Sequence, residues 1–295
     1  MNPTPTSSLR DRKEPMKTFP RVRLAILGAG NIGIAIARGL VLSGAVQPAQ
    51  ISLTRRKIHL LETFRKEGYV VLPDNRQAVA SADAVLVGVE PQQINALLTE
   101  IRPALKPGRH VLVSVVSGVS LREINAVLGK KIQVVRAMPN IAAAIGESIT
   151  CLAFYPERTR PETKALVRSL FEPVGKVMVI DEEQMIAATV LGACGIAFFL
   201  RAIRAASQGG IEVGFHSQDA LVIAAQTARG AASLLLRSDH HPESEIDRVT
   251  TPRGCTISGL NQMEHEGFSS AMIKGILTSR DKAAKLYRID EAHKP

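Results

Sequence analysis

The sequence predicts an α/β protein, with an N-terminal Rossmann-like, doubly wound sheet followed by an all-α dimerisation domain. Two observations carry this prediction. Up to about residue 180, short apolar runs alternate with stretches of helical periodicity, as in βαβ units whose strands are covered on both faces. Beyond Asp181 the strand signal stops and only helical spacing remains. We expect a disordered tail over residues 1–20, a sheet domain over 21–180 and a helical domain over 181–295.

The expected strands are short and rich in aliphatic and β-branched residues. The first one ends in a glycine-rich stretch, and the helical pattern that follows it runs from Asn31 to Ser43, with Ile32, Ile36 and Leu40 on one face. Further helical patterns separate the later strands, which favours a parallel sheet. In chain order the expected strands are 21–27, 51–54, 84–89, 111–115, 133–137, 148–153 and 176–180.

The helical half begins with a stretch that is apolar nearly all round. Residues 185–200 contain no charge, but they number 16, whereas a membrane span needs about 20. We therefore predict a buried helix rather than a span. Because a domain of about 115 residues cannot easily surround such a helix, we expect a homodimer built on this half. The long helices are expected at 185–207, 218–236 and 268–287.

Composition narrows the class of protein. The net charge of +10 suits an anionic ligand, but 8 Phe, 3 Tyr and no Trp argue against a surface that stacks nucleic-acid bases. The cysteines Cys151, Cys194 and Cys255 are too few and too widely spaced for a disulfide framework or a thiolate metal cluster. We expect a cytoplasmic protein with no resident metal, no nucleic-acid partner and no membrane association.

A glycine motif indicates a dinucleotide. Gly28, Gly30 and Gly33 form the pattern GxGxxG, which follows an expected strand and opens an expected helix. In that context the first glycine permits the tight turn, the second lets a pyrophosphate approach the backbone, and the third allows close packing of helix on strand. The N-terminus of the helix adds free N–H groups and a partial positive charge.

The end of the second strand indicates which cofactor binds. NAD sites usually carry a carboxylate there, bonded to the ribose 2′-hydroxyl. Here the sequence is Thr54, Arg55, Arg56 and Lys57, with no carboxylate. Guanidinium groups attract a 2′-phosphate, so we predict NADPH, with NADH possible as a second donor.

The stretch from Val249 to Leu260 indicates a substrate site. Thr251 followed by Pro252 predicts an N-cap and a first helical position. Gly254, Cys255 and Thr256 would then present main-chain N–H groups as a carboxylate trap. A helix that is merely capped explains the same residues equally well.

Four segments in order give the chain a family resemblance: Gly28–Gly33, Gly88–Pro91, Arg136–Asn140 and Val249–Leu260. Over residues 21–290 the chain resembles pyrroline-5-carboxylate reductase. The resemblance implies reduction of 1-pyrroline-5-carboxylate to L-proline, the last step of proline biosynthesis, with NADPH or NADH. It also implies an intertwined homodimer, which in this family is often assembled into decamers, and an active site between the nucleotide domain of one subunit and the helical domain of its partner.

Carried over by position, the resemblance also names site residues. Thr256 would face the ring nitrogen as the catalytic residue. The substrate residues would be Thr250, Thr251, Gly254, Cys255, Thr256 and Asn140. Together with the glycine motif and the end of the second strand, the cofactor residues would be Leu27, Gly28, Ala29, Gly30, Asn31, Ile32, Gly33, Thr54, Arg55, Arg56, Asn75, Gly88, Val89, Glu90, Pro91 and Ser117.

The chain departs from the family pattern at several positions. In the substrate loop, Thr251 replaces a serine, Arg253 a glycine and Cys255 a small residue. Elsewhere, Glu90 stands for a lysine, Ile141-Ala142 for Thr-Pro, and Gly192–Ile196 for a Ser-Gly-Ser-Gly-Pro segment.

These departures keep other functions open. One is a related NADPH-dependent reductase of another cyclic imino acid, and another is a non-catalytic NADP-binding paralogue. A β-hydroxyacid dehydrogenase would need a lysine on the long helix, and residues 185–200 contain none.

Overall fold

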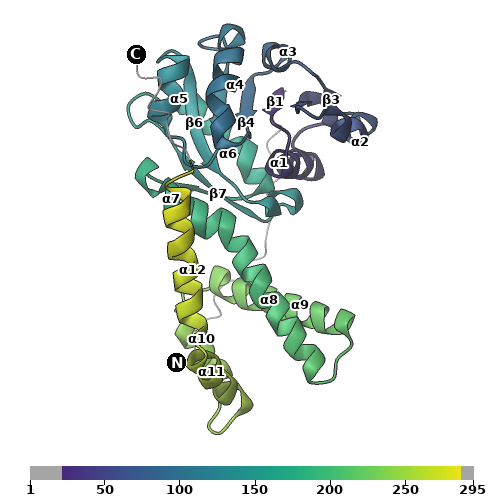
Figure 1. The fold of residues 1–295 in the computed structure, drawn as a ribbon, viewed down its shortest axis with the longest axis vertical. Helices are drawn as coiled ribbons and strands as arrows, with labels where there is room; N and C mark the ends of the chain where they lie inside the picture. The colour runs from purple at the N-terminus through teal and green to yellow at the C-terminus, as the bar shows by residue number, and fades with distance from the viewer. Residues whose placement is uncertain (1–21, 287–295) are drawn as a thin grey trace, which may run out of the picture.

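The computed structural model describes residues 22–286 and contains one eight-stranded sheet (Figure 1). Its strand order is β3-β2-β1-β4-β5-β6-β7-β8. All neighbours from β3 to β6 are parallel, β7 is antiparallel to β6, and β8 is parallel to β7. The strands are β1 Leu24–Leu27, β2 Ile51–Thr54, β3 Val70–Val71, β4 Ala84–Val87, β5 Val111–Ser114, β6 Gln133–Met138, β7 Ser148–Ala153 and β8 Gly175–Val179.

Helices connect most of the strands and make up most of the described chain after β8. Those of the sheet domain are α1 Asn31–Leu42, α2 Glu62–Lys66, α3 Asn75–Ser81, α4 Ile94–Ile101, α5 Leu121–Leu128 and α6 Pro161–Phe171. Those of the helical half are α7 Met185–Ala188, α8 Gly195–Glu212, α9 Ser217–Arg237, α10 Pro242–Val249, α11 Cys255–His265 and α12 Phe268–Ala283. The sheet with helices followed by a helical half confirms the predicted fold class.

Two features of the sheet were not expected from the sequence. The strand β3 has only two residues, too few to give a periodicity signal. The antiparallel β7 follows β6 through a short connection that contains the 3₁₀ segment Ile141–Ile145. An antiparallel pair can be joined in this way, whereas a parallel pair needs a crossover of a dozen or more residues.

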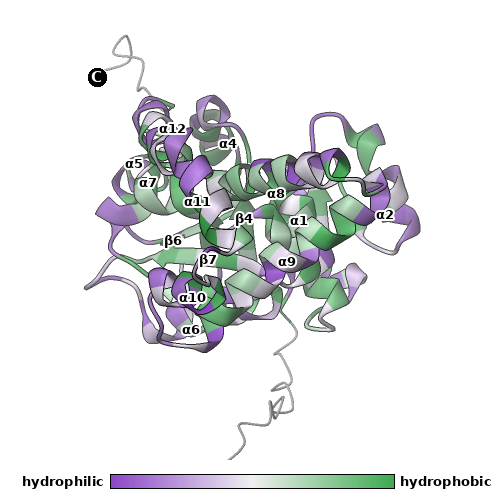
Figure 2. Ribbon diagram, turned by 90° about the horizontal axis from the view of Figure 1, so that it is seen from below, coloured by the Kyte–Doolittle hydropathy of each residue, from purple (hydrophilic) through white to green (hydrophobic). Residues whose placement is uncertain are grey.

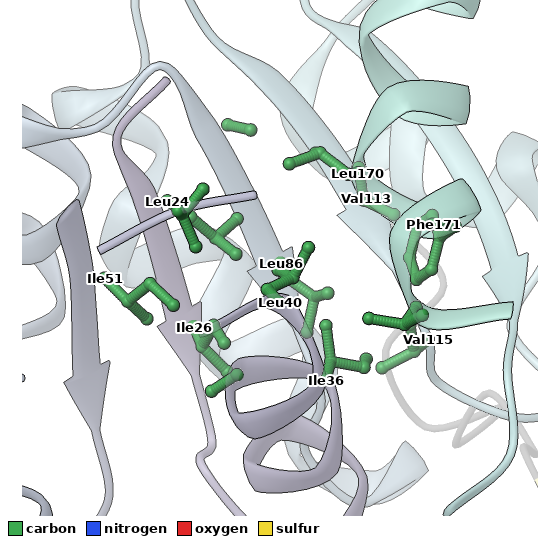
Figure 3. Packing of buried hydrophobic residues seen from close by; sticks show 14 of the residues in the cluster. Leu24, Ile26, Ile36, Leu40, Ile51, Leu86, Val113, Val115, Leu170 and Phe171 are labelled. Atoms are coloured by element: carbon green, nitrogen blue, oxygen red, sulfur yellow. The ribbon is translucent and has the colours of Figure 1, made fainter. Parts of the chain in front are cut away.

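The core lies on both faces of the sheet, because successive strand residues point to opposite sides. On one face, Leu24 and Ile26 pack with Ile36 and Leu40 of α1 (Figure 3). On the other face, residues such as Leu27 belong to a second buried cluster with α3, α4 and α5. Burial on both faces explains why the central strands read as continuous apolar runs.

The helical half extends away from the sheet as an arm (Figure 1). One continuous helix, Glu182–Glu212, is long and apolar enough to cross a membrane by length and composition, and only 17% of its most apolar 18-residue window is buried. Leu191, Phe199 and Leu200 are each more than half exposed. We expected residues 185–200 to be buried against a second chain, and one chain by itself leaves this helix largely exposed, as that expectation requires.

Other apolar surface lies beside the same helix. Helices α8 and α9 run side by side with apolar residues along both (Figure 2). Ile141 and Ile145 of the 3₁₀ segment line a shallow groove against Phe199 and Leu200 of α8, and nearly all of its surface is apolar. The predicted tail over residues 1–20 lies outside the described residues.

Candidate active site

The loop between β1 and α1 has the shape that a pyrophosphate needs. Gly28 has a φ of +81°, and a Cβ there would lie 2.5 Å from Val89 Cγ1, so only glycine fits. A Cβ on Gly33 would lie 2.8 Å from Ile26 Cγ2, which explains the close approach of α1 to β1. At Gly30, by contrast, the nearest atom would be the Gly28 carbonyl oxygen at 3.9 Å, so the space outside the loop is open.

The N-terminus of α1 faces that open space without a side-chain cap. Its N-cap is Gly30, whose lack of a side chain leaves the first N–H groups of the helix without a local acceptor. The loop itself is tied to the next strand, because the N–H groups of Gly28 and Ala29 donate to the Thr54 carbonyl at 3.2 and 2.8 Å. The residues present therefore fit a bound dinucleotide.

The carboxyl ends of three neighbouring strands bring further expected residues to this loop. Gly88–Pro91 follow β4 and Ser117 follows β5, and both strands are parallel to β1. The Gly88 N–H donates to the Leu27 carbonyl at 2.9 Å, which joins the two loops. Leu27 and Ala29 are fully buried, so they can offer a ligand only their main-chain groups.

The basic residues after β2 are available to an anion. Arg55 is half-buried and Arg56 is exposed. Neither forms an ion pair with any residue in the part of the chain that the structure describes. Two unpaired guanidinium groups beside an open loop are suited to a phosphate.

Thr54 and Asn75 meet at the end of β2, together with a residue that sequence reasoning missed. The buried Thr54 hydroxyl donates to Asn75 Oδ1 at 2.6 Å, and Asn75 Nδ2 donates to the Glu100 carboxylate at 3.1 and 3.2 Å. Glu100 lies on α4, in a different βα unit, and no local motif marks it.

The substrate loop differs from its predicted form. Helix α11 begins at Cys255 with Gly254 as its N-cap, so the prediction of Thr251 as N-cap and Pro252 as first helical residue is wrong. Residues 251–254 instead form a turn, closed by the Gly254 N–H donating to the Thr251 carbonyl at 2.9 Å. Proline favours both the first helical position and the second position of a turn, which is why the sequence did not distinguish them.

The turn changes which N–H groups can bind a carboxylate. The Gly254 N–H is used within the turn, so the predicted trap loses that member and starts at Cys255 and Thr256. No side chain caps α11. Arg253 has a φ of +60°, and is the one residue other than glycine with a positive φ among residues 22–286.

The side chains of the loop are in different situations. The Thr250 hydroxyl donates to the Ile246 carbonyl at 2.8 Å, at the end of α10. Thr251 and Cys255 are exposed and Thr256 is half-buried. Within the described chain the Thr256 hydroxyl has no hydrogen-bond partner, so it is available to a ligand.

Asn140 is engaged inside the protein. It is 6% exposed, its Nδ2 donates to the Gly192 carbonyl at 3.0 Å, and its Oδ1 accepts from the Ala142 N–H at 3.0 Å. Gly192 lies in a π-helical segment, Thr189–Cys194, where the helical hydrogen-bond ladder is shifted. The amide thus holds this part of the long helix against the end of β6.

A buried ion pair also joins the sheet to the long helix. Arg136 on β6 is 5% exposed and its Nη1 lies 3.3 Å from Glu182 Oε1. The same carboxylate oxygen accepts the Leu121 N–H at the start of α5. Burial lowers the pKa of Arg136, while Glu182 acts in the opposite direction. Removing Glu182 would leave the buried charge of Arg136 unpaired.

One chain does not bring the two parts of the site together. The glycine loop lies at the sheet, whereas α11 lies at the far end of the arm (Figure 1). Thr250–Thr256 therefore cannot meet Gly28–Gly33 within a single chain of this shape.

Comparisons with known proteins assign a family model to the sheet domain and another to the helical half. Residues 182–286 match the family model described as pyrroline-5-carboxylate reductase dimerisation, and residues 23–118 match NADP oxidoreductase coenzyme F420-dependent. Pyrroline-5-carboxylate reductase 1 of Dictyostelium discoideum is 50% identical over 92% of this chain, although the chain spans only 51% of that relative. Pyrroline-5-carboxylate reductase 2 of the same organism is 44% identical, over 89% of this chain and 92% of the relative.

Solved structures show the same architecture. Pyrroline-5-carboxylate reductase from Coxiella burnetii has a TM-score of 0.80 and 27% identity, over 92% of this chain and all of that one. Pyrroline carboxylate reductase from Plasmodium falciparum, solved with NADP bound, has a TM-score of 0.83 and 20% identity, over 92% of this chain and all of that one.

Proposed function

This chain belongs to the pyrroline-5-carboxylate reductase family, and from that premise we propose that it reduces 1-pyrroline-5-carboxylate to L-proline. It is an NAD(P)H-dependent oxidoreductase, and we assign its nucleotide domain to residues 21–180 and its helical domain to 181–295. The observation that carries the proposal is the N-terminus of α11, where uncapped N–H groups lie beside a free threonine hydroxyl.

The cofactor residues divide by the part of the molecule they would hold. The pyrophosphate fits the open space at Gly30 and the N–H groups that begin α1. Arg55 and Arg56 suit the 2′-phosphate, which favours NADPH over NADH. Gly88–Pro91 follow β4 and Ser117 follows β5, so they lie at the same carboxyl edge of the sheet as the glycine loop, where the nicotinamide would bind. When bound, NADPH supplies the hydride.

The substrate residues orient a ring-closed imine. The N–H groups of Cys255 and Thr256 bind its carboxylate at the positive end of α11. The Thr256 hydroxyl contacts the ring nitrogen, which carries a proton when the neighbouring carbon accepts the hydride. Held by these contacts, the carbon would be oriented for hydride transfer, which requires the reacting atoms to come within about 3–3.5 Å of each other and water to be excluded.

Two chains are needed for one such site. The helical half matches a family model for a dimerisation domain. Its exposed apolar helix would be stabilised by burial against another chain. We therefore propose a homodimer through residues 181–290, in which the glycine loop of one subunit meets α11 of the other. The family resemblance extends this to larger assemblies such as decamers.

For the compartment we propose the cytoplasm, because the three cysteines are free and widely spaced in the sequence. Cys151 is buried, which raises the pKa of its thiol.

The decisive experiment is an assay of the purified chain with 1-pyrroline-5-carboxylate and NADPH. We expect loss of NADPH absorbance with formation of an equal amount of L-proline. A six-membered cyclic imino acid, tested in parallel, measures ring-size preference, which the substitutions at Arg253 and Ile141 could alter. A chain that binds NADPH but reduces neither compound would contradict the proposal and favour the non-catalytic alternative.

A further inference from the structure

Three side chains from three different elements form one hydrogen-bonded line at the end of β2. Thr54 donates to Asn75 Oδ1, and Asn75 Nδ2 donates to both oxygens of Glu100. A carboxylate can only accept, so the nitrogen of the amide must point to α4 and its oxygen to β2. The orientation of Asn75 is thereby fixed at both ends.

This line lies directly beneath the glycine loop. The Thr54 carbonyl receives the N–H groups of Gly28 and Ala29, and Arg55 follows in sequence. In dinucleotide-binding folds the end of the second strand is where a carboxylate contacts the adenosine ribose. Here the strand ends in Thr54, which has no carboxylate. The carboxylate of Glu100 on α4 lies near this position, but it contacts Asn75, which stands between it and Thr54.

The environment of Glu100 needs an explanation. The residue is half-buried and forms no ion pair with any residue between 22 and 286. The nearby Arg76 Nε donates to the Glu100 main-chain carbonyl at 2.8 Å. A carboxylate without an ion-pair partner, close to a site for an anionic cofactor, is unfavourable. By orienting the Asn75 amide, Glu100 would contribute to cofactor binding and so offset the repulsion between its own carboxylate and the anionic cofactor.

We propose that Glu100 is a positioning residue for the adenosine ribose of the cofactor and acts through Asn75. The inference rests on the proposed function, because it assumes that this edge binds a dinucleotide. With its oxygen held by Thr54 and one N–H held by Glu100, Asn75 keeps a second N–H and a second lone pair. These groups remain available to the ribose and its 2′ substituent.

The test is equilibrium binding of NADPH and NADH, followed by the fluorescence of the reduced nicotinamide. We expect Glu100→Ala to weaken binding of NADPH by roughly 3- to 10-fold, the range of one neutral hydrogen bond. Glu100→Gln keeps an acceptor for the Asn75 amide and should restore most of the affinity. With NADPH saturating, kcat for the imine should stay at the wild-type value. Glu162→Ala, which removes an exposed carboxylate on α6, is the matched control.

A double variant separates positioning from a direct or merely structural role. If Glu100 acts through Asn75, the pair Asn75→Ala with Glu100→Ala binds NADPH no more weakly than Asn75→Ala alone. Additive losses, or wild-type affinity in Glu100→Ala, would overturn the inference. Because binding is read without turnover, a wild-type chain that binds NADPH but fails to reduce the imine refutes the proposed function and leaves this test intact.

Discussion

Replacing Arg253 by glycine should stabilise the protein, although it removes a large side chain. The turn from Thr251 to Gly254 has proline at its second position and Arg253, with φ +60°, at its third. That is the pattern of a type II turn, whose third position normally requires glycine. The arginine is exposed and forms no ion pair or hydrogen bond within the described chain, so little is lost with it.

The size of the effect follows from two opposing contributions. A left-handed conformation costs an L-residue about 1–2 kcal/mol, which glycine would relieve. Glycine also gains freedom in the unfolded chain, which opposes folding by about 0.4–1 kcal/mol. We therefore expect Arg253→Gly to raise the free energy of unfolding by about 0.8 kcal/mol, within limits of about 0 and 1.6 kcal/mol set by the two contributions.

Denaturant unfolding followed by circular dichroism, at one fixed chain concentration, measures this difference. Arg253→Ala is the control, because alanine keeps the strain while losing the guanidinium. Arg253→Asn should lie between them, since asparagine tolerates the left-handed region. Equal stability of the glycine and alanine variants would refute the assignment of backbone strain to this turn.

Three further predictions concern the site. Thr256→Ala should lower kcat by roughly 100-fold, a loss of about 2.7 kcal/mol, if the hydrogen bond of its hydroxyl tightens as charge moves in the transition state. Thr256→Ser should retain much of the wild-type kcat and Cys255→Ala nearly all of it. Steady-state kinetics in which Cys255→Ala loses more activity than Thr256→Ala would reverse the roles of these two residues. Replacing Arg55 and Arg56 by alanine should raise KM for NADPH by about 10-fold or more and hardly change KM for NADH; equal kcat/KM for the two cofactors in the wild type would exclude a phosphate contact. Subunits carrying Thr256→Ala, refolded together with an equal amount of subunits carrying Gly28→Ala, should regain about a quarter of wild-type activity. Half of the dimers are then hybrids, and each hybrid has one intact site of two, formed by the glycine loop of the first subunit and Thr256 of the second. A mixture that stays inactive would mean that each site lies within one chain.

Much of the fold could be predicted because its signals are local. The expected bounds of β2 and β7 match the structure residue for residue, since each is a short run rich in aliphatic and β-branched residues. The sequence did not predict the local structure correctly where one residue is compatible with two conformations, or where a strand is too short to show a periodicity. Pro252 suited both a helix start and a turn, and β3 is two residues long.

The site was predictable only in its local parts. Three spaced glycines between an expected strand and an expected helix mark the candidate nucleotide loop, because they permit the backbone geometry that a pyrophosphate needs. Glu100 could not be found in this way, since its relation to Asn75 depends on how α4 packs beside α3. The use of Asn140 inside the protein was equally invisible, because its partner is a main-chain carbonyl of a π-helical segment.

The arm has a consequence for how the protein folds. Its long helix follows the last strand in the chain, so the sheet domain can fold before any surface is present to cover Leu191, Phe199 and Leu200. In the homodimer proposed above, the final step of folding is an encounter between two chains, and its rate rises with chain concentration. Dilute refolding mixtures should accumulate a species with a formed sheet and an uncovered helix that is prone to aggregate. Yield in refolding should therefore pass through an optimum concentration, below which association is too slow and above which aggregation dominates.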